Sequence, residues 1–329
     1  MSSLVAWLRR WGISFASFAG GLFTLFVFRR GLPHVGWIVG YLLLLWLLVA
    51  MMVQVRDTLE TSARRAHRLV LTATNYTIQT LYHGVLLFQL PAYWAATTLG
   101  SPNLMLLVLL AALALLATFD PWYRMLVHPR PWLGYVFFLI SMFGALNLAL
   151  PLIGVPPFAA LLVAAWLAVV ALTPAVCRAR EWRWITGLAV TSLAGLAAAG
   201  MAGHWCIVIP PAPMFLASAA LDWTVGTLES PAPVAGAVHA SDLRERGLVA
   251  RTAIYAPAGL RQPVEHVWRR NGARVDLMRL TPIEGGRREG FRTFSRKTSF
   301  PGDPVGRWSV DVMTASGQLI GRLRFRVVP

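Results

Sequence analysis

The chain has 329 residues, of which 57% are hydrophobic and 13% are charged, and its formal net charge at pH 7 is +16. A soluble globular domain carries about 25% charged residues, so the composition excludes a single soluble domain. Only four of the 14 acidic residues precede residue 205, which indicates two parts in different solvents. The basic excess favours contact with anionic lipid head groups, and no nucleic-acid partner is expected.

Seven stretches before residue 204 are apolar enough to be membrane-spanning helices, which need about 20 mainly apolar residues to cross a bilayer. They cover approximately residues 11–28, 35–54, 69–90, 103–119, 133–152, 157–176 and 184–203. We therefore predict a polytopic transmembrane helical domain, an all-α bundle, over residues 1–203. The lipid bilayer is its expected partner.

Arginine residues are distributed unevenly among the connectors of these spans. With the N-terminus inside, the inner segments hold eleven arginines and the short outer connectors hold two, Arg29 and Arg30. Because cytoplasmic loops carry an excess of basic residues, this bias predicts a cytoplasmic N-terminus. The chain is then expected in the bacterial inner membrane, with the residues after Gly203 in the periplasm.

The third expected span is the most polar one. Asn75, Gln79, Tyr82 and His83 are spaced so that they lie on or near one face of a helix. Polar residues within a span either line a cavity or a lipid head-group groove, or they form hydrogen bonds between packed helices. The sequence leaves both readings open.

The last expected span carries small residues four positions apart, including Gly187, Gly195 and Gly203. Small residues at this spacing let another helix approach closely. The partner is either a helix of the same bundle or a separate membrane protein.

Motifs for catalysis or cofactor binding, such as G-x-S-x-G, H-E-x-x-H and the P-loop, do not occur. We predict no catalytic residues, no metal site and no cofactor. The inner loop at 120–130 is interpreted as an interfacial anchor, with Trp122 and Tyr123 at head-group level. An alternative is phosphate chemistry on a lipid head group by the acid, histidine and arginines of this loop, Asp120, Arg124, His128 and Arg130.

The segment 204–230 is expected to be an interfacial linker or a partial membrane segment, because "PPAP" breaks any helix. From residue 231 onward, hydrophobic residues recur with period two. Strands are expected at about 248–256, 264–270, 273–280, 291–298, 306–312 and 319–327. Asn271-Gly272 predicts a type I′ hairpin turn, and Trp308 is a candidate core residue. This number of short strands predicts an all-β, immunoglobulin-like sandwich over 231–329.

Arginines are concentrated at a few positions of this expected sandwich. The candidate binding residues are Arg269 and Arg270 at the hairpin tip and Arg322, Arg324 and Arg326 on the last strand. Such a group of arginines could bind anionic envelope lipid or an acidic protein. Alternatively, it is a solvated face that protects a strand from aggregation.

The segment from "IYAPAGL" through "EHVWRRNG" to "GRWSVDVMTASGQLIGRLRFRV" resembles the bacterial family called domain of unknown function 2914 (DUF2914), over about the last 80 residues. The membrane part is similar to the uncharacterised family 5924 (DUF5924). Neither resemblance implies an activity or supplies catalytic residues.

The expected function is that of a binding or scaffolding component, in which the helices anchor a periplasmic sandwich that engages an envelope component or partner subunit. The alternative is a transporter or lipid-handling protein that uses the polar third span. It has less support because the spans contain no buried carboxylate and no visible inverted repeat.

Overall fold

The computed structural model describes residues 35–60, 65–127, 129–224 and 237–329. The chain divides into two compact units. Among the described residues, the helical unit comprises those within Met1–Ala92, Leu106–Ala149 and Ala159–His204, and the β unit comprises those within Trp205–Pro329 with the connectors Tyr93–Met105 and Leu150–Phe158. The first expected span, 11–28, lies outside the described residues.

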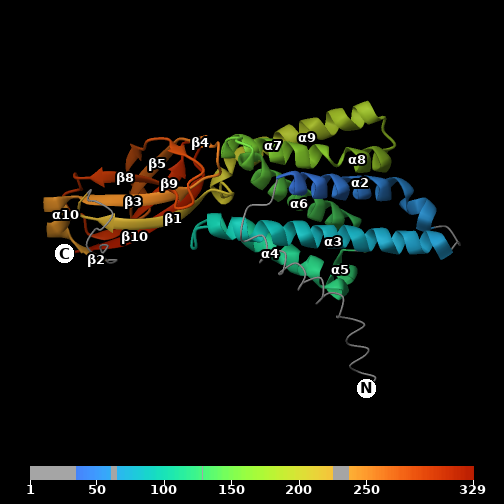
Figure 1. Cartoon of the computed structure of the whole chain (residues 1–329), viewed down its shortest axis with the longest axis horizontal. Helices are drawn as coiled ribbons and strands as arrows, with labels where there is room; N and C mark the ends of the chain where they lie inside the picture. The colour runs from blue at the N-terminus through green and yellow to red at the C-terminus, as the bar shows by residue number, and fades with distance from the viewer. Residues whose placement is uncertain (1–34, 61–64, 128, 225–236) are drawn as a thin grey trace, which may run out of the picture. The chain divides into compact units, whose positions relative to one another are not determined.

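Each of the other six expected spans coincides with helix. Most of the long helices of the helical unit run alongside one another (Figure 1). The helices before residue 205 are α2 (Val35–Glu60), α3 (Arg65–Ala96), α4 (Leu104–Thr118), α5 (Asp120–Leu126), α6 (Pro131–Leu152), α7 (Pro157–Val170), α8 (Thr173–Arg180) and α9 (Trp184–His204).

Three of the described helical segments are long and apolar enough to cross a membrane: α6, the segment Pro157–Arg180 that contains α7 and α8, and α9. The pair α4 and α5, bent by 104°, would form a fourth if it is one span. Helix α3 is long, but its polar residues lower its hydropathy. The N-terminal region is thus helical and suited to a membrane, and the total of seven spans stays a prediction.

The β unit is built from short strands that form three sheets. The orders are β1-β3-β8, β2-β10-β9-β5-β6 and β4-β7, and every pairing is antiparallel except β2 with β10. The elements are η1 (Cys206–Val208), β1 (Phe215–Asp222), β2 (Ala237–His239), α10 (Ala240–Arg246), β3 (Leu248–Tyr255), β4 (Arg261–Gln262), β5 (Val264–Arg270), β6 (Ala273–Arg279), β7 (Ile283–Glu284), β8 (Phe291–Lys297), β9 (Gly306–Thr314) and β10 (Leu319–Val328).

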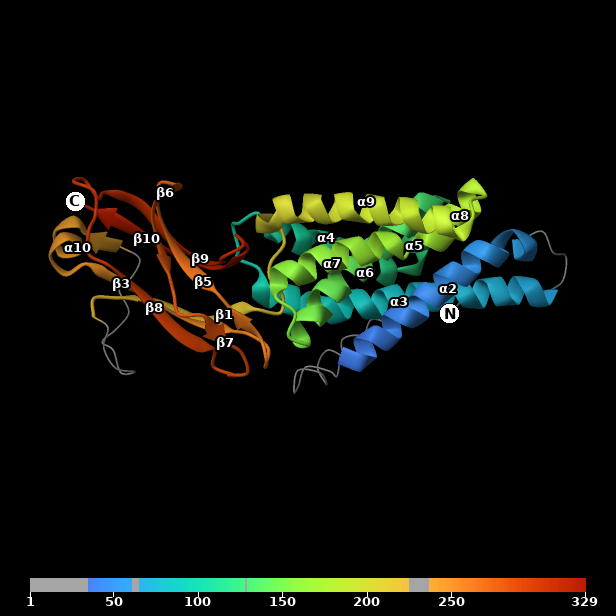
Figure 2. The ribbon, with the colours of Figure 1, turned by 90° about the horizontal axis from the view of Figure 1, so that it is seen from above.

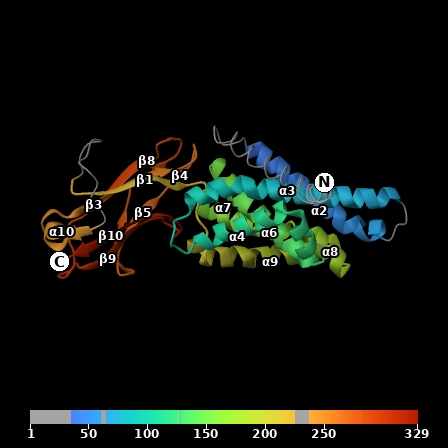
Figure 3. The same ribbon diagram turned by 90° about the horizontal axis from the view of Figure 1, so that it is seen from below.

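The two larger sheets enclose one hydrophobic core, with β3 and β8 on one side and β9 and β10 on the other (Figures 2 and 3). The indole of Trp308 stacks on Phe325, and Trp268 meets the same ring edge-on, with ring centroids 6.0 and 6.3 Å apart. Trp308 is 2% exposed, which confirms it as a core residue. The C-terminal region is therefore β-rich, with apolar side chains of both sheets excluded from water.

The hairpin β5–β6 forms at the expected turn. Asn271 and Gly272 have φ angles of 50° and 89°, and a type I′ turn needs positive φ at both central positions. The expected strands lie within a few residues of β3, β5, β6, β8, β9 and β10. Turn chemistry and period-two alternation are local properties, so they predict these elements well.

The structure differs from expectation between residues 204 and 230. Phe215–Asp222 is strand β1, which pairs with β3 from Phe215↔Tyr255 to Asp222↔Val249. The rings of Phe215 and Tyr255 stack at 4.7 Å. The run "FLASAALD" lacks period-two alternation, because Ala217, Ser218 and Ala219 are all exposed. Its strand conformation comes from pairing with β3.

Candidate functional site

One face of the five-stranded sheet points away from the core and carries a group of arginines. Alternation along β10 puts Arg322, Arg324 and Arg326 on this face, as expected. Their partners on β9 are Asp311, Ser309 and Arg307, and β5 and β6 add further arginines. We define the arginine face by Arg269, Arg274, Arg307, Arg322, Arg324 and Arg326.

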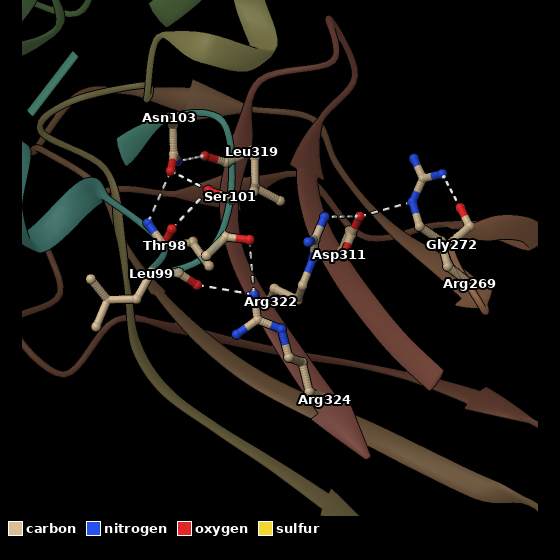
Figure 4. Close-up of polar contacts among 11 residues, drawn as sticks. Thr98, Leu99, Ser101, Asn103, Arg269, Gly272, Asp311, Leu319, Arg322 and Arg324 are labelled. Carbon is tan, nitrogen blue, oxygen red and sulfur yellow. Dashed lines mark hydrogen bonds and ion pairs between the residues drawn. The ribbon is translucent and has the colours of Figure 1, made fainter. Parts of the chain in front are cut away.

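Asp311 holds two of these arginines in place (Figure 4). Arg322 donates from Nη2 to Asp311 Oδ2 at 2.9 Å and from Nε to Oδ1, so the pair is bidentate. Arg269 donates from Nε to the same Oδ2 at 2.9 Å, and from Nη1 to Gly272 O at 3.3 Å. Because the Asp311 carboxylate is buried, two neighbouring cations compensate for its desolvation.

Arg324 contacts the connector between α3 and α4, which belongs to the β unit (Figure 4). Its Nη2 donates to Leu99 O at 2.9 Å and to Gly100 O at 3.3 Å. Asn103 of the connector is buried and lies with Nδ2 3.5 Å from Leu319 O. Arg324 therefore has a structural partner that lies 225 residues earlier in the chain.

Arg270 lies apart from the other candidates. Consecutive residues of a strand point to opposite faces, so Arg269 and Arg270 cannot both lie on the arginine face. Arg270 donates from Nη2 to Val305 O at 2.8 Å and reaches Asp303 at 3.4 Å. These contacts fasten the loop before β9.

Three exposed arginines of the face, Arg274, Arg307 and Arg326, make no side-chain hydrogen bond or ion pair among the residues that the structure describes. Arg326 lies directly opposite Arg307, and Arg274 directly opposite Arg269. Like charges in opposite positions destabilise a sheet. These pairs do not stabilise the fold. An external anion would reduce the repulsion between them, so this part of the face is suited to bind one.

Sequence reasoning missed Arg274 and Arg307 because it treated strands singly. The Asn271-Gly272 turn fixes the β5–β6 register and could have placed Arg274 opposite Arg269. The position of Arg307 requires the β9–β10 pairing, which the short "TASG" turn also suggests.

The candidate Gln79 of α3 lies where α4 ends and the chain bends into α5. Its Nε2 donates to Asp120 Oδ1 at 2.7 Å and to Ala117 O at 3.1 Å. In a continuous helix Ala117 O would accept from the backbone N–H of residue 121, but that residue is Pro121, which has none. Gln79 thus replaces a backbone hydrogen bond at the bend, where an unpaired carbonyl in an apolar setting would be costly.

His83 and Gln89 are also buried against neighbouring helices. His83 Nδ1 lies 2.9 Å from Thr118 Oγ1, and Gln89 Nε2 donates to Ser141 O at 3.1 Å. Both contacts join α3 to another helix of the helical unit. Hydrogen bonds of this kind are typical of packed membrane helices.

Tyr82 and Asn75 complete the polar candidates of α3. Tyr82 is buried, with its ring 5.7 Å from that of Phe137 and its hydroxyl 3.5 Å from Gly134 O. Asn75 is half-buried. These contacts of Gln79, Tyr82, His83 and Gln89 are with α4, α5 and α6.

The small residues of α9 face α7 and α8. A Cβ atom at Gly187 would overlap the sulfur of Cys177, and one at Gly195 would lie 2.9 Å from Trp166 O. Gly203 is half-buried. Close approach within the bundle explains the glycines at 187 and 195.

Gly195→Ala is expected to destabilise the helical unit by about 1–3 kcal/mol, because the added methyl group meets backbone of α7 that cannot move aside. Gly200→Ala on the same helix is the matched control, since a Cβ there has nothing within 4 Å. That control should be neutral or slightly stabilising, because alanine favours helix. Thermal unfolding of the full chain in detergent measures both, and equal midpoints would contradict the packing account.

Few groups in the described part of the chain could support metal binding or phosphate chemistry. Across the described ranges, no three His, Cys, Asp or Glu side chains lie close enough together to hold a metal ion. Asp120 accepts from Gln79, and His128 lies outside the described residues. Trp122 is exposed and Tyr123 is buried, so only Trp122 is available as an interfacial anchor.

Comparison with known families agrees with both resemblances. The model of a family of unknown function, DUF5924, matches residues 1–250, and the model of a protein of unknown function, DUF2914, matches residues 261–327. No curated protein and no solved structure matches the chain. The function must therefore be argued from the residues themselves.

Proposed function

The chain belongs to the family of unknown function DUF5924, and we propose that it is an integral inner-membrane protein whose helices anchor a periplasmic binding domain. In this proposal seven helices span the bilayer and the β unit presents the arginine face to an acidic protein partner. The role is binding or scaffolding rather than catalysis.

The helical unit supports the membrane part of the proposal. Three or four apolar helical segments of sufficient length lie in the described residues, and the expected first span precedes them. Exposed apolar side chains occur along α9, including Ile185, Leu193 and Leu196. A helix with such a surface is suited to lipid. The arginine bias of the connectors supports a cytoplasmic N-terminus.

The strand order supports an immunoglobulin-like sandwich. If β3, β5, β8, β9 and β10 correspond to strands B, C, E, F and G, then B and E share one sheet and C, F and G share the other, as in immunoglobulin domains. The buried Trp268 lies on strand C, where those domains carry a tryptophan. The free Cys177 and Cys206 lie outside these strands, so the B–F disulfide of antibody domains has no counterpart.

The main support for a binding role is the set of like-charged pairs on the arginine face. Asp311 holds Arg269 and Arg322, and a connector holds Arg324, so these three side chains of the face are held in place. Arg274, Arg307 and Arg326 then project from this framework without partners among the described residues. Guanidinium groups bind carboxylates through paired hydrogen bonds, and a held framework beneath them lowers the entropy that is lost on binding.

Site-specific photo-crosslinking in cells tests this role. A photoreactive amino acid at Ser309, in the middle of the face, should yield an adduct with a partner, whereas one at the exposed Ser299 should not. Arg307→Gln with Arg326→Gln should reduce the Ser309 adduct at least about tenfold, since each charge-assisted bond contributes roughly 1.5–3 kcal/mol. Equal adducts at both positions, or adducts that persist without the two arginines, would reject the proposal.

The alternative, a transporter or lipid-handling protein that uses α3, has weaker support. Gln79, His83 and Gln89 contact neighbouring helices, and these contacts account for their polarity. A transport pathway would need polar groups that face a cavity.

A further inference from the structure

A second group of arginines lies on the loop between β7 and β8 and on the first residues of β8. The loop residues line an open depression of about 420 Å³. Its lining consists of Arg287, Arg288, Glu289, Gly290 and Arg292. The depression is large enough for a phosphodiester with its glycerol.

The backbone of this loop is fixed by hydrogen bonds to another loop. Gly285 N donates to Leu260 O at 2.9 Å, and Gly286 N donates to Ala256 O at 3.0 Å. Within the loop, Gly290 N donates to Arg287 O at 3.1 Å and closes a turn. These hydrogen bonds therefore define the backbone positions of the loop arginines.

Two glycines show how tightly the loop is seated. A Cβ at Gly285 would overlap the carbonyl oxygen of Pro257. Gly290 has a φ of +83°, and a Cβ there would lie 2.9 Å from the backbone of Ala253. The loop is thus held close against β3 and its following turn, which lowers the entropy that a ligand would have to overcome.

The charges on this fixed loop are mostly positive. The guanidinium of Arg287 lies over the ring of Phe291, 4.9 Å from its centroid, which orients that group. Arg292 pairs with Glu289 at 3.2 Å, but both side chains are more than half exposed, so water weakens the pair. Arg288 is exposed and makes no hydrogen bond or ion pair within the described part of the chain.

The turn after β3, against which the loop packs, adjoins a connector between two candidate membrane spans. An added Cβ at Gly286 would lie 3.4 Å from Ala258, and one at Gly154 would lie 3.8 Å from Gly259 O, all within the β unit. Gly154 lies in the connector 153–156 between α6 and α7. A short connector between spans lies at the membrane surface, where lipid phosphates are found.

We infer that Arg287, Arg288 and Arg292 form a binding site for the phosphate of an anionic phospholipid. Planar guanidinium groups bind phosphate oxygens in pairs, and three of them outweigh the single carboxylate of Glu289. The inference rests on the membrane placement in the proposed function, but it does not depend on the partner of the arginine face.

Titration of the purified full chain in detergent with dioctanoyl phosphatidylglycerol, followed by native mass spectrometry, tests the site. The wild type should bind the lipid, and Arg287→Gln with Arg288→Gln should weaken binding at least about tenfold. Arg288→Lys keeps the charge without the planar group and should bind with intermediate affinity. Dioctanoyl phosphatidylcholine should bind at least tenfold more weakly than the anionic lipid.

Arg274→Gln with Arg307→Gln is the matched control, because it removes the same charge from the arginine face and should leave lipid binding unchanged. Three results would overturn the inference: unchanged binding in the loop variant, equal binding of the two lipids, or displacement of the anionic lipid by equimolar inorganic phosphate. Since the loop variant leaves Ser309 and its arginines intact, its crosslinking there should persist. The lipid titration and the crosslinking experiment therefore distinguish failure of the lipid site from failure of the arginine face.

Discussion

Replacement of Asp311 by alanine is expected to lower the free energy of unfolding of the β unit by about 3 kcal/mol, because two guanidinium groups lose the anion that they share. The Asp311 side chain is 2% exposed, whereas Arg269 and Arg322 are 28% and 20% exposed. Water can reach both arginines in part, which keeps the cost at the lower end for a broken buried pair. Thermal unfolding of the full chain, with hydrogen exchange of the β9 and β10 amides, measures the loss.

Asp303→Ala is the matched control. Its carboxylate is 74% exposed and pairs with Arg270 at 3.4 Å, so its removal should cost less than about 1 kcal/mol. Asp311→Asn keeps an acceptor for one arginine and should fall between the two. If Asp311→Ala unfolds no more readily than Asp303→Ala, the carboxylate does not organise the arginine face.

The strands that the sequence predicts well are those with local signals. In β9 and β10 the side chains alternate between core and surface, and Asn271-Gly272 marks a turn by its own backbone preference. Strand β1 has no such signal, because its small residues tolerate either environment and its pairing with β3 decides its conformation. The bend between α4 and α5 follows from Pro121, yet only the structure shows that Gln79 supplies the missing donor.

The candidate site was predictable within one strand but not between strands. Alternation places Arg322, Arg324 and Arg326 on one face, and the same rule separates Arg269 from Arg270. The pairing of arginines with one another and with Asp311 depends on register among four strands. The contact of Arg324 with Leu99 O joins positions that no local pattern connects.

The buried His266 predicts how the β unit responds to acid. Its Nδ1 lies 2.8 Å from Ser295 Oγ and its Nε2 lies 3.1 Å from Thr252 Oγ1, so β5 is joined to the opposite sheet through a neutral ring. Burial lowers the pKa of His266 from 6.5 to about 4. The nearby Asp276 accepts from Lys297 at 2.6 Å, and this hydrogen bond lowers the pKa of Asp276 below 3.8.

The free energy of unfolding should fall by roughly 3 kcal/mol between pH 7 and pH 4 through His266 alone. Below pH 6.5 the unfolded chain binds a proton on this imidazole, whereas the folded chain stays neutral until about pH 4, so acid favours unfolding across that window. Asp276 stabilises the folded chain above about pH 3.8, because its folded pKa is lowered from that value. This stabilisation is lost at lower pH, as the carboxylate is protonated.

His266→Gln separates this effect from general acid sensitivity. The variant should be less stable at pH 7, since glutamine cannot reproduce both bonds, but its loss of stability between pH 7 and pH 4 should be roughly 3 kcal/mol smaller than that of the wild type. His239→Gln is the control, because the imidazole of His239 is exposed and contacts the carbonyl oxygen of Pro329, and it should keep the wild-type slope. Chemical denaturation of the full chain at several pH values measures both slopes. A wild-type slope in His266→Gln would show that His266 does not cause the loss of stability in this pH window.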